Sequence, residues 1–247
     1  MTPRQLQRVC GMNLAMTAKR TNSKVSAGAD YDDQDFSGRD FSRADLSDCE
    51  FNNCIFTGTN FRAANLSRSR FEQCQFNNTE SNTPADFSQA TLRETQFVHC
   101  NLTVVDFVQA SAYDICFEHC QLQGADLSTA DFRLPFGNTT LTGLNISDCN
   151  LAYANLSNTF LVECRIIDSR LTETCLDYCD LTGANLQGCE LSNISARGVT
   201  LLGVDLRGAA FNNINPREID LRGARINYGQ VAALLDPMGI IVDDDPA

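Results

Sequence analysis

The chain has 247 residues, of which 43% are hydrophobic and 20% charged, and its formal net charge is −12. No apolar run approaches the roughly 18–20 residues needed to cross a bilayer, so we expect no membrane span. The excess of acids argues against direct nucleic-acid binding, which depends on clustered Lys and Arg.

Residues 1–29 form a basic N-terminal extension that we expect to be partly disordered. Residues 1–24 contain no acid and five basic residues, namely Arg4, Arg8, Lys19, Arg20 and Lys24. The remaining chain carries 14 Arg, no Lys and all 31 acids, a formal charge of −17. The extension distantly resembles a targeting leader, but Asn13 interrupts its apolar stretch and no strong cleavage motif follows. A disordered tail, or an upstream start before Met12 or Met16, explains the composition better.

Residues 30–227 carry an internal repeat with a period of five. Phe, Leu or Ile recurs at every fifth position in three stretches, Phe36 to Phe76, Phe87 to Phe132 and Leu141 to Ile226. The exceptions are Ala112, Ala196 and Pro216. A second column of small residues lies two positions earlier. A period of five fits neither an α-helix nor a single strand, whereas stacked turns would bury both columns, so the repeat predicts a solenoid of short strands.

We expect both columns to form an inert core. A spacing of 20 residues would stack Phe36 on Phe56 and Phe97 on Phe117 as aromatic ladders. Nine of the 12 cysteines occupy the small column, namely Cys49, Cys54, Cys74, Cys100, Cys120, Cys149, Cys164, Cys179 and Cys189. There they act as small hydrophobes. Free thiols in this number fit a reducing compartment, so we expect a cytoplasmic location.

Candidate catalytic and metal-binding residues are scarce. The pairs His99-Cys100 and His119-Cys120 lie 20 residues apart, but neighbouring side chains alternate in direction, which turns the cysteines inward and the histidines outward. We therefore expect a stacked surface histidine pair and no metal site. With no nucleophile–base pair and no glycine-rich phosphate loop, we expect no cofactor, no catalytic residue and no enzyme activity. Turnover that depends on His99 or His119 would contradict this expectation.

The repeat is interrupted twice, and interruptions of a regular scaffold are good candidates for function. The first, residues 77–86, is polar and rich in turn-forming residues, so we expect an exposed loop. Its candidate partner-binding residues are Thr79, Glu80, Ser81, Asn82, Thr83 and Pro84.

The second interruption, residues 133–140, differs in character. It contains candidate partner-binding residues Leu134, Pro135, Phe136, Gly137 and Asn138. Leu134 and Phe136 fall outside the inward column, and an apolar loop tip can anchor a partner. Two hypotheses stay open: Phe136 contacts a partner, or it folds back onto the rod.

Residues 228–247 form a C-terminal segment with its own pattern. Residues 230–235 predict a short helix that ends at Pro237, and an acidic tail follows. The segment has six apolar residues that could cover an open β edge or form a two-fold dimer contact, namely Val231, Leu234, Leu235, Met238, Ile240 and Ile241.

The motifs ADLSDCEFNNCIF, ANLSRSRF and ADLSTADF resemble pentapeptide-repeat proteins, and the resemblance covers residues 34–227. It implies an all-β fold, a right-handed quadrilateral β-helix with four pentapeptides per coil and about nine coils. The two interruptions, their order and the terminal sequence DLRGARINYGQVAALLDPMGIIV are similar to the Qnr-type quinolone-resistance proteins within that family.

That similarity implies a dimer, joined through the C-terminal segment, that binds DNA gyrase and often topoisomerase IV and protects them from fluoroquinolones. An acidic rod could act as a DNA mimic in a basic saddle, or the loops could destabilise the drug–enzyme–DNA complex, and both mechanisms stay open. The alternative is a regulatory or scaffolding protein with an unrelated protein partner.

Overall fold

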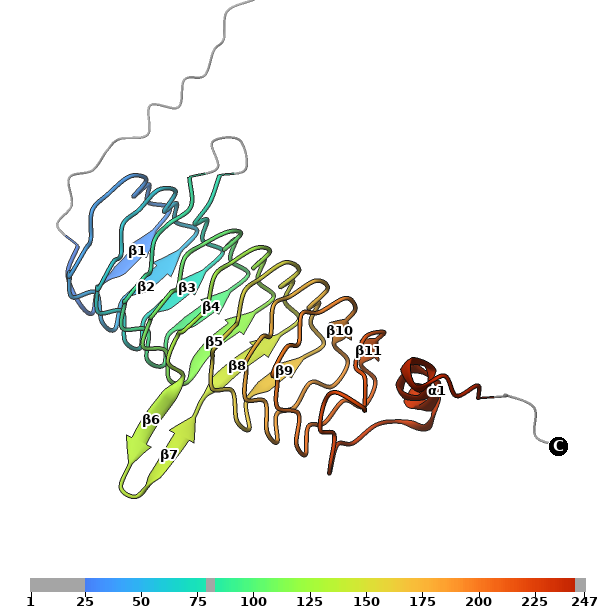
Figure 1. Ribbon diagram of the computed structural model, residues 1–247. Coiled ribbons are helices and arrows are strands. Elements are labelled where there is room, and N and C mark those ends of the chain that lie inside the picture. The colour runs from blue at the N-terminus through green and yellow to red at the C-terminus, as the bar shows by residue number, and fades with distance from the viewer. Residues whose placement is uncertain (1–24, 79–82, 243–247) are drawn as a thin grey trace, which may run out of the picture.

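The computed structural model describes residues 25–78 and 83–242, which form a rod of stacked coils (Figure 1). The main sheet runs along the rod in the order β1-β2-β3-β4-β5-β8-β9, and every neighbouring pair is parallel. These strands span Asp30–Asp32, Glu50–Asn52, Arg70–Glu72, Gln96–Val98, Ile115–Glu118, Leu144–Ser147 and Arg165–Ile167. A shorter parallel pair, β10 (Glu190–Leu191) and β11 (Ala210–Phe211), continues the rod.

The other faces of each coil are joined by single parallel bridges. Asp35 pairs with Ile55, Asp40 with Asn60, and Asp45 with Asn65, each pair 20 residues apart. One turn of the chain therefore takes 20 residues and passes four faces. The predicted right-handed quadrilateral β-helix is confirmed.

An Asp or Asn precedes many of the large residues and closes the corner between two faces. Asp40 Oδ1 accepts a hydrogen bond from the backbone N–H of Ser42 at 2.9 Å, and Asn60 Oδ1 accepts one from Arg62 at 2.9 Å. A short side chain that hydrogen-bonds to the backbone two residues on is typical of tight turns. This local bond explains why the repeat needs Asp or Asn at that slot.

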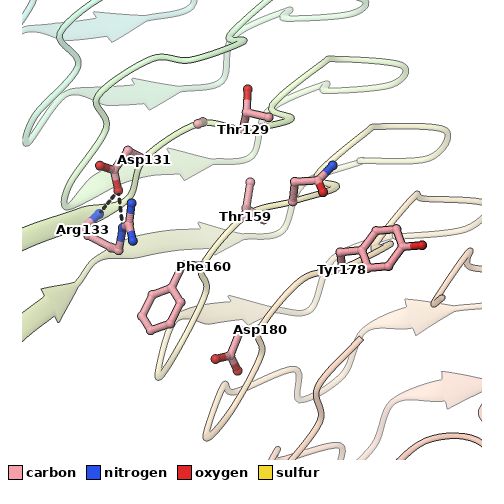
Figure 2. Close-up of a pocket in the computed structure, with 9 residues that line it drawn as sticks. Thr129, Asp131, Arg133, Thr159, Phe160, Tyr178 and Asp180 are labelled. Atoms are coloured by element: carbon pink, nitrogen blue, oxygen red, sulfur yellow. Dashed lines mark hydrogen bonds and ion pairs between the residues drawn. The ribbon is translucent and has the colours of Figure 1, made fainter. Parts of the chain in front are cut away.

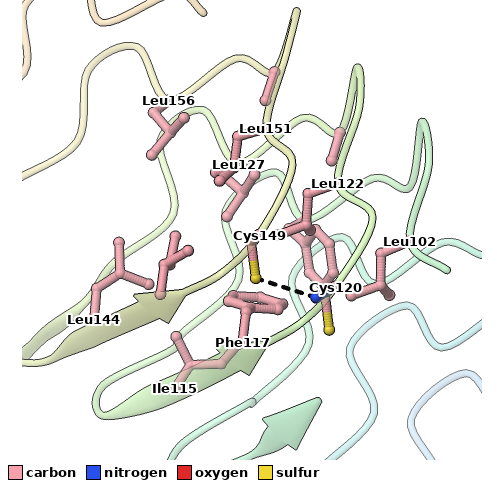
Figure 3. Close-up of a cluster of buried hydrophobic side chains, with 14 of the residues drawn as sticks. Leu102, Ile115, Phe117, Cys120, Leu122, Leu127, Leu144, Cys149, Leu151 and Leu156 are labelled. Carbon is pink, nitrogen blue, oxygen red and sulfur yellow. Dashed lines mark hydrogen bonds between the residues drawn. The ribbon is translucent and has the colours of Figure 1, made fainter. Parts of the chain in front are cut away.

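The inward columns form one continuous core, as predicted. Phe36 stacks on Phe56 with ring centroids 5.2 Å apart, and Phe97 stacks on Phe117 at 5.3 Å. All nine cysteines of the small column are buried and free. Figure 3 shows Cys120 and Cys149 beside the leucines of this core, where the backbone N–H of Cys120 donates to Cys149 Sγ at 3.2 Å.

The second interruption is a β-hairpin made of β6 (Arg133–Phe136) and β7 (Thr139–Thr142), which projects from the side of the rod (Figure 1). The expectation that Leu141 returns to the inward column is wrong, because Leu141 pairs with Leu134 in the hairpin and is 41% exposed. The coil resumes at β8, where Ile146 pairs with Phe117 and is buried.

The C-terminal end of the rod is covered by a short helical segment. It consists of η1 (Tyr228–Gln230), α1 (Val231–Leu235) and η2 (Asp236–Met238). Ala233 and Leu234 pack against the core, and Gln230 Nε2 donates to the carbonyl oxygens of Leu206 and Ala209. Among the described residues, no helix is long and apolar enough to span a membrane.

One position near this end departs from the expected column. Pro216 is only half-buried, whereas Ile214, two residues earlier, is buried in the core. Asn215 begins a local turn here, in which its carbonyl oxygen accepts hydrogen bonds from the N–H groups of Glu218 and Ile219. The 20-residue pairing resumes afterwards, where Asp205 bridges to Arg225.

Candidate protein-interaction site

The hairpin arises from a short local signal. Its strands are joined by Gly137 and Asn138, and Gly137 has a φ of 59°, which favours glycine at this turn position. Thr139 Oγ1 donates to the carbonyl oxygen of Phe136 at 2.9 Å, which fastens the two strands beside the turn. The two-residue turn and the cross-strand pairs give this interruption a defined shape.

The tip of the hairpin carries an apolar side chain away from the rod. Phe136 is 67% exposed, and Leu134 behind it is half-buried. Of the two hypotheses for Phe136, folding back onto the rod does not occur in this structure. An exposed aromatic ring on a projecting β-hairpin has the geometry of a protein-contact residue.

An open pocket of about 390 Å³ lies at the foot of the hairpin (Figure 2). The guanidinium of Arg133 lies 5.7 Å from the centre of the Phe160 ring, and Arg133 Nε donates to Asp131 Oδ1 at 2.7 Å. Tyr178 and Asp180 line the far side. The pocket therefore offers rings and carboxylates next to the projecting strands.

A local opening of the coil stacking accompanies this pocket. Asp131 pairs with Ser111 and Phe160 pairs with Asp180, but among the described residues no bridge joins Asp131 to Phe160. The neighbouring bridges Gln121–Asn150 and Asp126–Asn155 join residues 29 positions apart, so Asp131 and Phe160 would be the next pair. The chain instead turns away into β6 directly after Phe132. The sequence analysis did not single out Phe160, although an aromatic residue in the Asp/Asn slot of the repeat is a readable signal.

Acidic groups on the rod perturb one another. Burial works against ionisation of Asp131, but its hydrogen bonds with Arg133 outweigh that effect and lower its pKa. Asp86, Asp106 and Asp126 stack on one another in successive coils. Partial burial, together with the two neighbouring carboxylates, raises the pKa of Asp106. Stacked coils thus concentrate negative charge along a face.

The first interruption is only partly described. Thr79, Glu80, Ser81 and Asn82 lie outside the described residues. Thr83 is exposed, and its carbonyl oxygen accepts a hydrogen bond from the N–H of Gly58 at 2.8 Å, while Pro84 is half-buried. This interruption therefore rejoins the rod at Thr83.

The predicted dimer residues lie in the C-terminal segment from Tyr228 to Val242, called the C-terminal cap below. Val231, Leu234, Leu235 and Met238 are half-buried, whereas Ile240 is exposed and Ile241 is 86% exposed. Leu234 is half-buried because it packs against the core at the last coil. The exposed isoleucines leave an apolar surface at this end of the rod.

The histidine pair lies as predicted. The rings of His99 and His119 stack with centroids 4.8 Å apart and planes 6° apart, on the outside of the rod, while Cys100 and Cys120 point into the core. Within residues 25–78 and 83–242, no group of three His, Cys, Asp or Glu side chains is placed to hold a metal ion.

Comparisons with known proteins agree with this geometry. The sequence matches the family profile described as a pentapeptide repeat region over residues 29–83, and the profile of pentapeptide repeats over residues 85–124, 136–166, 145–177 and 164–203. A comparison with curated proteins gave no match.

Solved structures of QnrB1, a plasmid-mediated fluoroquinolone resistance protein, are similar to this chain. A trypsin-treated variant is 30% identical with a TM-score of 0.80, and covers 85% of this chain and 99% of its own. The full-length protein is 29% identical with a TM-score of 0.81, over 85% of this chain and 100% of its own. The repeat, the coiled fold and these matches together show that the chain belongs to the pentapeptide repeat family and resembles its Qnr-type members.

Proposed function

We propose that this protein binds DNA gyrase, and topoisomerase IV as a second target, and protects them from fluoroquinolones. The observation that carries the proposal is the similarity to QnrB1, a fluoroquinolone resistance protein, at a TM-score of 0.80–0.81 over its whole length. The match covers 85% of this chain and 99–100% of the QnrB1 chains.

The elongated shape and negative charge of the rod favour a partner with a basic surface. The chain beyond residue 24 carries a formal charge of −17, and the carboxylates of Asp86, Asp106 and Asp126 stack in three successive coils of the rod. DNA-binding enzymes present a basic surface to duplex DNA, which is itself a rigid anion. Attraction of this kind is screened beyond about 8–10 Å at physiological salt, so close contacts must add specificity.

The hairpin is the feature best placed to supply such contacts. Phe136 is held out from the rod on two paired strands, so it can enter a partner without any rearrangement of the coils. Buried aromatic anchors carry a large share of binding energy at protein interfaces. We assign Phe136 and the neighbouring Leu134 to the partner contact, together with the first interruption at residues 77–86.

The C-terminal cap supports a two-fold dimer. Ile240 and Ile241 are exposed next to half-buried Met238, and pairing of identical apolar ends would double the length of the rod. Sedimentation equilibrium of the wild type and of Ile241→Asp measures this directly. A wild-type monomer at micromolar concentration contradicts the dimer.

The test of function is DNA supercoiling by gyrase in the presence of ciprofloxacin, with increasing amounts of the protein. Recovery of supercoiling is expected at protein concentrations comparable with that of gyrase. A broad titration that restores no activity contradicts the proposal. In that case, affinity capture of a partner other than a topoisomerase would favour the regulatory or scaffolding alternative.

A further inference from the structure

The first coil of the rod has an edge that no strand of the described residues pairs with. Amides of the second coil donate to carbonyl oxygens of the first at 2.9–3.1 Å, and they belong to Glu50, Ile55, Asn60 and Asn65. The equivalent amides of the first coil belong to Asp30, Asp35, Asp40 and Asp45, and none of these donates to a described residue. Within residues 25–78 and 83–242, the edge thus has one N–H without a partner on each of its four faces, and such a row is a template for pairing with another segment.

Apolar side chains are also less covered at this end. Tyr31 and Phe41 are half-buried, whereas Phe51 and Phe61, at the same positions one coil later, are fully buried. At the opposite end, the segment with α1 covers the last coil. Solenoids need a cap at each end because a terminal repeat has a neighbour on one side only.

The edge of the first coil is strongly acidic. Residues 25–48 carry seven exposed carboxylates, namely Asp30, Asp32, Asp33, Asp35, Asp40, Asp45 and Asp48. Asp48 is already paired with Arg68 of the second coil at 2.7 Å, so the other six carry the charge considered below. Arg39 and Arg43 are the only basic residues of this stretch, so its formal charge is −5. Residues 1–24, with five basic residues and no acid, carry the opposite charge of +5.

The chain enters the rod at this same edge. Val25 packs against the core, and the N–H of Ser26 donates to the hydroxyl oxygen of Tyr31 at 3.0 Å. Residue 24 is therefore tethered within reach of the first coil, and 24 residues are enough to cross an edge built from 20. A tethered segment acts at a high effective concentration, so weak contacts suffice for docking.

We propose that residues 1–24 dock on the first coil and act as its cap. In this proposal their basic side chains lie against the carboxylates of the first coil other than Asp48, and their apolar side chains cover Tyr31 and Phe41. The basic extension is then a structural part of the rod that shields its open amides and prevents association through this edge.

The distribution of lysine permits a direct test. Lys19 and Lys24 are the only lysines of the chain, so, apart from the N-terminal amine, every zero-length carbodiimide cross-link from an amine to a carboxylate must start in this segment. In the full-length protein we expect Lys19 to link mainly to Asp35, Asp40 and Asp45. Links spread evenly over the 31 acids would overturn the proposal.

Two controls separate the possible occupants of the edge. An equimolar mixture of ¹⁴N- and ¹⁵N-labelled protein distinguishes links within one chain, which support the proposal, from links between chains, which overturn it in favour of a second copy. The variant Lys19→Arg keeps the charge but removes the reactive amine, so the links assigned to Lys19 must disappear. In 1 M salt, where charges are screened beyond about 3 Å, the yield of these links should fall severalfold.

Hydrogen exchange gives an independent measurement. In a full-length variant with Arg4, Arg8, Lys19, Arg20 and Lys24 all changed to Gln, we expect the four open amides of the first coil to exchange about tenfold faster than in the wild type. The amide of Asn60, paired in the second coil, is the internal control and should not change. Equal exchange of the four amides in both proteins would overturn the proposal.

Discussion

Phe71 and Phe97 stack in the core with ring centroids 4.9 Å apart and ring planes 6° apart, although 26 positions separate them. Phe51 and Phe71, with no interruption between them, stack at 4.8 Å over 20 positions. The six additional residues of the first interruption therefore leave the spacing of the coils unchanged. The stack of phenylalanine rings stays continuous across the interruption, so the additional residues do not separate neighbouring coils.

This stack can be tested by removing one ring. Phe97→Ala leaves a cavity between Phe71 and Phe117, and we expect it to lower the free energy of unfolding by about 3–5 kcal/mol, measured by denaturant titration. Phe136→Ala, on the exposed tip, is the matched control and should change stability by less than about 0.5 kcal/mol. A loss below about 1 kcal/mol for Phe97→Ala would contradict a tightly packed column.

The return of the hairpin to the rod depends on Gly143. A Cβ atom at this position would lie 2.7 Å from the backbone N and 2.9 Å from the Cα of Asp114, and neither backbone atom can move aside easily. We expect Gly143→Ala to lower the free energy of unfolding by about 1–3 kcal/mol. Gly229→Ala, where no atom lies within 4 Å of the added Cβ, is the control. Equal free energies of unfolding for the two variants would show that the backbone at Asp114 can shift to make room for the added methyl group.

The exposed ring of Phe136 is expected to act in binding rather than in folding. Phe136→Ala should require about tenfold more protein for the same recovery of gyrase supercoiling in ciprofloxacin, because an aromatic anchor is lost. Its melting temperature should match that of the wild type. Ile55→Ala, another exposed apolar residue but on a coil of the rod, serves as control. Full protection by Phe136→Ala would remove this ring from the partner contact.

One ion pair gives the rod a defined response to acid. Arg207 donates to both oxygens of Asp205, and these hydrogen bonds, with Arg225 nearby, lower the pKa of Asp205 to about 2. Since the folded-state pKa lies below the ordinary value of about 3.9, the carboxylate contributes stability above pH 4 and loses it as the pH falls from about 4 to about 2. We therefore expect the difference in melting temperature between the wild type and Asp205→Asn to shrink over that range.

The partner of this ion pair provides the control. Arg207→Gln removes the main donor of the hydrogen bonds but leaves Arg225 near Asp205, so it should show a similar or smaller loss of stability near neutral pH and should also converge with the wild type in acid. The double variant should be no less stable than the less stable single variant, because the two changes break one interaction. A difference between the wild type and Asp205→Asn that stays constant down to pH 2 would contradict the lowered pKa.

The period of five predicted the coil, the core and the direction of most side chains. Phe36, Phe97 and Cys120 are buried where the count places them, and His99 and His119 stack outside the rod. Sequence alone sufficed there because each coil contacts only its two neighbours, so one local rule repeats along the whole chain.

The five-residue period predicted a wrong core position where the chain leaves the coil. Leu141 has the residue type and nearly the spacing of a core position, yet it lies in the hairpin, while Leu144 and Ile146 are buried in the resumed coil. Pairing of Leu134 with Leu141 competes with a return to the rod, and the sequence holds apolar residues suited to both. For the pocket between Asp131 and Phe160, the aromatic residue in the Asp/Asn slot at position 160 was the sequence signal, but the bridge missing between these two residues is seen only in three dimensions.

The sequence by itself determined that the chain winds into an acidic rod with an inert core, because every fifth side chain must be buried and an isolated turn cannot bury it. The tertiary structure alone decided that Phe136 projects outward, that Phe160 lies beside an opening in the coil stack, and that the amides of Asp30, Asp35, Asp40 and Asp45 find no partner among the described residues. These features depend on which strands find a partner, and such pairing joins residues 20 or more positions apart.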